Sequence, residues 1–185
     1  MILPLTNSEK VQKYESILAN NNNWVSTTTS VVKVGDVIVP CAATGTQGTA
    51  AAGDFVIPAG AATSASTGLL GVVVAVRQRG GQTELSSITS ATVGSANTTS
   101  STPYVVEWIS CRENIDWIAD IGSAVSTSDK VNSYSIANSS GGTDSGTLTA
   151  ATFGSTGVFN GYKALQDSAG NLKKVVGRFI LSTVL

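Results

Sequence analysis

The strongest strand signal in the chain is Leu69-Leu70-Gly71-Val72-Val73-Val74-Ala75-Val76. This run is rich in β-branched valine, is too short for a typical helix and is apolar on every side, so it predicts a strand buried on both faces. The residues that follow it, Arg77 to Gly81, end in a Gly-Gly pair that predicts a turn. A buried strand of this kind needs neighbouring strands to cover it.

Such neighbours are predicted on both sides of this run. Two of them share one form, in which a Gly-Asp pair at 35–36 or 53–54 leads into a short β run that proline ends, at residues 37–40 and 55–58. Further apolar or alternating runs predict strands at residues 31–34, 104–109, 117–122 and 175–181.

Long segments of small and polar residues separate these runs. Residues 42–52, 86–102 and 138–146 consist almost entirely of Ala, Ser, Thr, Gly and Asn, so they predict long surface loops with little to bury. No amphipathic helix is predicted after residue 23. We therefore predict an all-β fold, an antiparallel β-barrel or β-sandwich of the jelly-roll or β-tulip-like kind, with an N-terminal arm and long Ser/Thr/Gly loops.

The first 23 residues differ from the remainder and predict a separate N-terminal arm, followed by a single β domain over residues 24–185. The spacing of Val11, Tyr14 and Leu18 fits one face of a short helix with Ser8 as its N-cap, and an extended arm lying on a neighbouring subunit fits equally well. Four asparagines at 20–23 predict the hinge. The candidate partner-contact residues are Leu3, Leu5, Val11, Tyr14, Ile17 and Leu18.

Composition argues against two classes of partner. Charged residues make up 12% of the 185 residues, the net charge is -1, and the eleven Lys and Arg are scattered, so no basic face for nucleic acid is predicted. No apolar run approaches the roughly 20 residues of a membrane helix. The start, at residues 1–6, lacks the features of a secretion signal, so we expect synthesis and folding in a cytosol.

Catalytic chemistry is poorly supplied. The chain has no histidine, which removes the commonest general base and metal ligand. Cys41 and Cys111 predict free buried thiols, although a disulfide between them stays open. We predict no catalytic residue, no metal and no cofactor, and so no enzyme. The alternative is a carboxylate-based hydrolase, which needs two acids brought together from the densest acidic set, Glu107, Glu113, Asp116 and Asp120.

Aromatic residues leave a second alternative open. The three tryptophans, Trp24, Trp108 and Trp117, predict core packing, but exposed together they would form a platform for sugar stacking. That arrangement would favour a receptor-binding β module, such as a phage tail-fibre head or an adhesin.

The order of segments resembles the small bacteriophage head decoration proteins, also called capsid cement or stabilisation proteins. Two short runs carry the resemblance in the first half, Val34-Gly35-Asp36-Val37 and Gly68-Leu69-Leu70-Gly71-Val72. In the second half, residues 116–122 lead into a Ser/Thr/Gly-rich loop, and a Val-Val-Gly-Arg-Phe strand at 175–179 follows near the end. The resemblance covers residues 24–185.

This resemblance implies a structural function. Such proteins have a β-barrel or sandwich body, are often trimeric, and sit on the outside of an expanded icosahedral shell, where they bridge capsid subunits. For this chain it implies the major capsid protein and further copies of itself, as a homotrimer, as partners. The expected location is the virion, at the surface of the phage head, after synthesis in the host cytoplasm.

Overall fold

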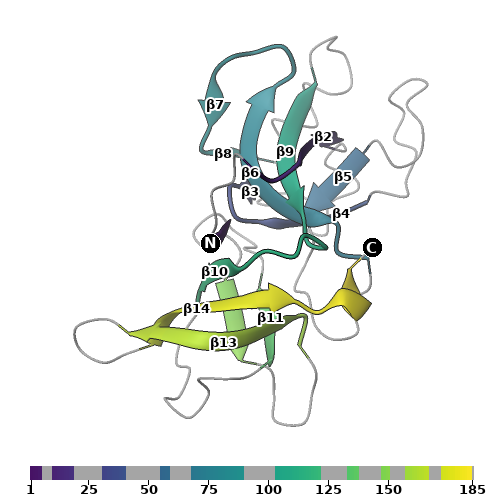
Figure 1. Ribbon diagram of the computed structural model, residues 1–185. Helices are drawn as coiled ribbons and strands as arrows, with labels where there is room; N and C mark the ends of the chain where they lie inside the picture. Colours follow the sequence, from purple (N-terminus) through teal and green to yellow (C-terminus); the bar gives the residue numbers. More distant parts are fainter. Residues whose placement is uncertain are drawn as a thin grey trace.

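The computed structural model of the chain describes residues 1–5, 10–18, 31–40, 55–58, 68–89, 103–121, 133–137, 147–150, 157–166 and 172–184 (Figure 1). These residues include β-strands and a short 3-10 turn, η4, and the described part contains no α-helix. The all-β prediction is therefore confirmed. The strands are β1 (Ile2–Pro4), β2 (Lys13–Leu18), β3 (Val31–Lys33), β4 (Val37–Pro40), β5 (Phe55–Pro58), β6 (Gly71–Gln78), β7 (Glu84–Leu85), β8 (Ser87–Thr89), β9 (Tyr104–Ser110), β10 (Trp117–Asp120), β11 (Ser133–Ala137), β12 (Thr147–Ala150), β13 (Phe159–Gln166) and β14 (Leu172–Phe179), and η4 spans Leu181–Thr183.

Five strands close into a small barrel in the upper part of Figure 1. Their order is β4-β5-β2-β9-β6, and because β4 also pairs with β6 the hydrogen-bonded circuit returns to its start. Every pair in this ring is antiparallel except β2 with β5. The pairing thus agrees with the predicted β-barrel or β-sandwich, with one parallel pair where only antiparallel pairs were expected.

The barrel interior is filled by aliphatic side chains and one tryptophan. Along β9, Val106 and Trp108 belong to this interior, as the two-residue period of a strand requires. The ribbon of β3 and β8 adds Val32 and Ile88 to the same core, so it packs against the barrel. The buried residues of the barrel core are Leu18, Val32, Ile38, Val56, Val73, Val76, Ile88, Val106 and Trp108.

A second sheet, in the order β1-β10-β14-β13-β11-β12, is antiparallel throughout and lies below the barrel in Figure 1. Three aromatic rings pack edge-on within its core, where Phe179 lies 5.5 Å from Trp117 and 5.4 Å from Phe159. The same core includes Val37 and Val72 from barrel strands β4 and β6. One shared apolar core therefore joins the second sheet to the outside of the barrel.

The helical alternative for the N-terminal segment is wrong. Residues 13–18 form β2, which is one of the five barrel strands and lies between β5 and β9. Residues 2–4 form β1, which pairs with β10. Residues 6–9 and 19–23, which include the four asparagines, lie outside the described residues. The division of the chain at residue 23 stays a prediction.

Two of the predicted long loops, residues 42–52 and 138–146, lie outside the described residues. The loop predicted at 86–102 is wrong at its beginning, because residues 87–89 form β8 and Ile88 is buried. The β8 strand forms because it pairs with β3, and this long-range pairing is not evident from the small and polar residues around Ile88.

Candidate functional site

A hollow of about 260 Å³ lies where the turn after β9 meets the end of β14. Its lining residues are those of the turn at 111–114, together with Arg178, Phe179 and Leu181. The turn is held by its own backbone: the Glu113 N–H donates to the Ser110 carbonyl at 3.1 Å, and the Ile115 N–H donates to the Glu113 carbonyl at 2.8 Å. Two segments more than 60 residues apart in sequence thus build the site.

Arg178 fastens this turn to β14. Its Nε donates a hydrogen bond to Asp116 at 2.8 Å, and its Nη1 donates one to Asn114 at 2.6 Å. Hydrogen bonds from Tyr162 and Arg178 lower the pKa of Asp116, while burial and the Asp116 carboxylate raise the pKa of Tyr162. Both groups therefore keep their usual protonation states near neutral pH, and the cluster supplies a bound pair of charges rather than a proton donor.

Two further charges stand at the rim. Arg112 is exposed and Glu113 is half-buried, and neither side chain makes an ion pair or hydrogen bond with the described residues. Two large apolar or aromatic side chains are also exposed nearby: Leu181 on η4, at 67%, and Tyr162, the partner of Asp116, at 47%. Tyrosine, arginine and an exposed aliphatic residue around a hollow are typical of a binding surface.

The Cys111 thiol closes the inner side of the hollow. It is a free thiol, buried to 2% exposure, and burial raises its pKa well above the usual range. A thiol in this state stays protonated and is a poor nucleophile. Cys111 belongs to the buried core that joins the second sheet to the barrel. Cys41 lies outside the described residues.

The acidic residues of the predicted stretch do not form one common site, because three of the four pair with different cations. Glu107 contacts Arg77 at 2.7 Å, and Asp120 contacts Lys174 at 2.8 Å and the Met1 ammonium at 3.0 Å. Burial acts to raise the pKa of Asp120, but its bonds to Lys174 and to the N-terminus outweigh this effect and lower the pKa. Within the described ranges, no three His, Cys, Asp or Glu side chains are placed to hold a metal ion.

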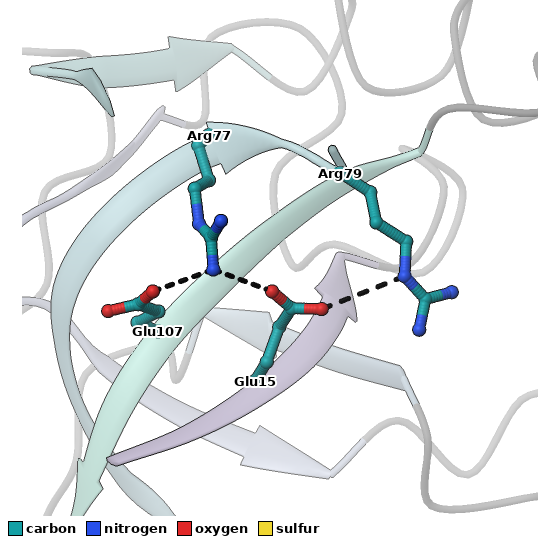
Figure 2. Close-up of polar contacts among 4 residues, drawn as sticks. All are labelled: Glu15, Arg77, Arg79 and Glu107. Carbon is teal, nitrogen blue, oxygen red and sulfur yellow. Dashed lines mark hydrogen bonds and ion pairs between the residues drawn. The ribbon is translucent and has the colours of Figure 1, made fainter. Parts of the chain in front are cut away.

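A second charged cluster crosses the outer face of the barrel (Figure 2). Arg77 of β6 reaches between two carboxylates, with its Nη2 2.8 Å from Glu15 of β2 and 2.7 Å from Glu107 of β9. Arg79 adds a longer contact, 3.6 Å from its Nε to Glu15. Because Glu15 and Glu107 are directly opposite each other in the strand register, Arg77 neutralises two like charges that would repel.

This cluster was missed by the sequence reasoning, which assigned Arg77 and Arg79 to a turn. A signal was present: the two residues are two positions apart at the end of a strand, so their side chains share one face. What the sequence did not show is which acidic residues lie opposite.

The tryptophans are core residues where they are described. Trp108 is 8% exposed, stacks on Tyr14 at 4.7 Å between ring centroids, and donates from Nε1 to the Ser16 hydroxyl at 3.0 Å. Trp117 is fully buried. The core-packing interpretation is confirmed for both, and Trp24 lies outside the described residues.

The six candidate contact residues divide by burial. Leu18 is fully buried in the barrel core and offers no surface to a partner, whereas Leu5 and Tyr14 are 50% and 36% exposed. The other three, Leu3, Val11 and Ile17, are half-buried. None of the six lines the hollow at the end of β14.

Comparison with known proteins gave no matching family model, no matching curated protein and no matching solved structure. Among the described residues, no helix has the length and apolar character needed to cross a membrane.

Proposed function

We propose that this chain is a non-enzymatic structural protein of a bacteriophage head, which binds the outside of the capsid and stabilises it by bridging capsid subunits. The observation that carries the proposal is that the few charged side chains form ion pairs between strands. In a chain with 12% charged residues, the described ion pairs tie strands together, as Arg77 does for β2, β6 and β9 and Lys174 does for β14 and β10.

Two further features support a mechanical role. The barrel and the second sheet share one core, so that a force on either sheet is transmitted through packed side chains. Beside the hollow, hydrogen bonds from Tyr162 and Arg178 lower the pKa of Asp116, and burial raises the pKa of the Cys111 thiol in its wall, which suits binding better than acid-base chemistry. Weak contacts repeated by capsid symmetry then add through multivalency.

Of the six N-terminal residues predicted to contact a partner, this proposal keeps only one. Deleting the first 20 residues would remove a barrel strand, so loss of attachment in such a deletion would report only unfolding. Leu5 is the best remaining candidate, because it is half exposed at the end of β1. We propose that Leu5 contacts the major capsid protein.

The test measures solution mass by light scattering and co-sedimentation with expanded, empty capsids of the phage that encodes the chain. Saturable co-sedimentation by a trimer, or by a monomer that trimerises on the shell, supports the proposal. Leu5→Glu should weaken attachment, while Thr83→Glu, a matched change at an exposed turn after β6, should not. A chain that ignores shells but is retained on cells or glycans would contradict the proposal and favour a receptor-binding module.

A further inference from the structure

We infer that the hollow at the end of β14 and its rim form the surface through which one copy of this chain binds a second copy. The inference rests on the proposed function, in which the chain is expected to attach to the shell as a trimer, and it names the surface between the copies. Its elements are the hollow itself, the exposed Leu181, and the adjacent charges of Arg112 and Glu113.

The apolar part of the surface offers both a projection and a recess. Leu181 is 67% exposed, the largest exposure among the exposed large hydrophobic side chains of the described residues, and it stands at the edge of the hollow. The volume of about 260 Å³ is many times the roughly 10–15 Å³ that a single water needs. The recess therefore has room for a leucine side chain, and Phe179 and Cys111 give it apolar walls.

The charged part of the surface selects the partner. Arg178 is already satisfied by Asp116 and Asn114, but Arg112 and Glu113 have no side-chain partner among the described residues. A partner of one sign would satisfy one of these charges and repel the other. A second copy satisfies both, because Arg112 of each copy meets Glu113 of the other.

The same reciprocity holds for either closed symmetry. Across a twofold axis, one neighbour supplies both charge pairs. Around a threefold axis, each copy uses Arg112 with one neighbour and Glu113 with the other. The inference therefore names the contact, and the measured mass gives the number of copies.

Charge reversal gives a test that misfolding cannot imitate. R112E carries two acidic groups at the rim and E113R carries two basic groups, so each variant alone repels its own copies. Each should associate about tenfold more weakly than the wild type, or worse, in sedimentation velocity. Mixed in equal amounts, the two variants should form mixed oligomers, identified by native mass spectrometry. Across a twofold axis both charge pairs are restored; around a threefold axis two of the three contacts are restored and one stays repulsive, so the mixture still associates more tightly than either variant alone.

Two more variants complete the experiment. L181D should weaken association by a similar factor without altering the monomer, because this side chain is mostly exposed. Arg79→Glu, which changes net charge as R112E does at an exposed position beside Pro103, at the other end of β9 from the turn, should assemble as the wild type does. Circular dichroism of each variant verifies the β fold before association is measured.

The outcomes separate this inference from the proposed function. If the wild type assembles and R112E, E113R and L181D assemble equally well, the assigned surface is wrong while self-assembly stands. If the wild type is a monomer at every concentration yet attaches to shells, the self-contact is wrong and capsid binding stands. A monomer that ignores shells overturns both.

Discussion

Replacing Arg77 by methionine removes the cation that separates two carboxylates on the barrel and keeps an unbranched apolar stem. In the wild type, its Nη2 lies 2.8 Å from Glu15 and 2.7 Å from Glu107 (Figure 2). The two acids are direct partners in the β2–β9 register. In R77M they face each other across hydrogen-bonded strands with nothing between them.

The magnitude of the effect follows from this geometry. Each half-exposed ion pair contributes up to about 1 kcal/mol. The two carboxylate oxygens that share the Arg77 nitrogen are no farther apart than the two distances combined, about 5.5 Å. Like charges at that separation repel by about 0.8 kcal/mol in bulk water and about 3 kcal/mol at an effective dielectric constant of 20. Since the three side chains are 26–34% exposed, we expect R77M to lose about 2 kcal/mol of unfolding free energy.

Urea unfolding followed by tryptophan fluorescence measures this loss. The triple variant R77M/E15Q/E107Q should recover about 1 kcal/mol of the lost unfolding free energy, because it removes the repulsion between the carboxylates but does not restore the ion pairs. R79M is the matched control: Arg79 is 57% exposed and 3.6 Å from Glu15, so its replacement should cost less than about 0.5 kcal/mol. An R77M protein as stable as R79M, or a triple variant no more stable than R77M, would refute the reasoning.

Three further predictions concern other parts of the fold. Gly71→Ala should lower the unfolding free energy by about 1–3 kcal/mol in the same urea assay, because a Cβ there would overlap the Trp108 ring. The lowered pKa of Asp116 gives stability that is present above the carboxyl's unfolded pKa, about 3.9, and lost as pH falls through the folded value; acid unfolding of Asp116→Asn should therefore depend less on pH below about 4. In a Cys41→Ser background, Cys111 should resist a thiol reagent at pH 8 in the native protein and react once urea unfolds it, and rapid native labelling would contradict its burial.

Strand positions were predictable where the sequence marks both ends. The Gly-Asp pairs and the closing prolines placed strands at 37–40 and 55–58, and the structure has β4 and β5 at those residues, paired antiparallel with each other. The buried run predicted at 69–76 is β6, shifted to 71–78 because β9 pairs with it through Gln78. By contrast, β11 was not predicted, although the buried Tyr134 and Ile136 alternate with serine in it. The alternation covers only five residues, and the strand geometry depends on pairing with β12 and β13.

The N-terminal segment shows why one spacing allowed two structures. Tyr14 and Leu18 are four residues apart, and such residues share a face in a helix and in a strand alike. The residue that separates the two patterns is Ser16, which faces the barrel interior in a strand and accepts the indole hydrogen bond of Trp108. In the sequence, a serine at this position favoured neither the helix nor the strand. Its hydrogen bond with Trp108 on β9 shows that it faces the barrel interior.

The candidate site was predictable in part. The acidic stretch drew attention to the turn after β9, but no sequence pattern indicated that Arg178, more than 60 residues later, binds Asp116 and Asn114 there. The sequence therefore indicated one wall of the hollow, as the acidic residues of the alternative hydrolase, and did not indicate the other wall. The opposite wall depends on the β10–β14 pairing, a long-range contact that local pattern does not encode.

That second wall also explains why Leu181 suits an interface. The η4 turn that carries it is anchored at both ends: the Ile180 N–H donates to the Val158 carbonyl at 2.9 Å, and Val184, buried in the shared core, bridges to Leu69 beside the barrel. An exposed side chain on an anchored turn loses little conformational freedom when a partner covers it. The free energy of burying Leu181 against a second copy is then available for association rather than consumed in ordering the chain.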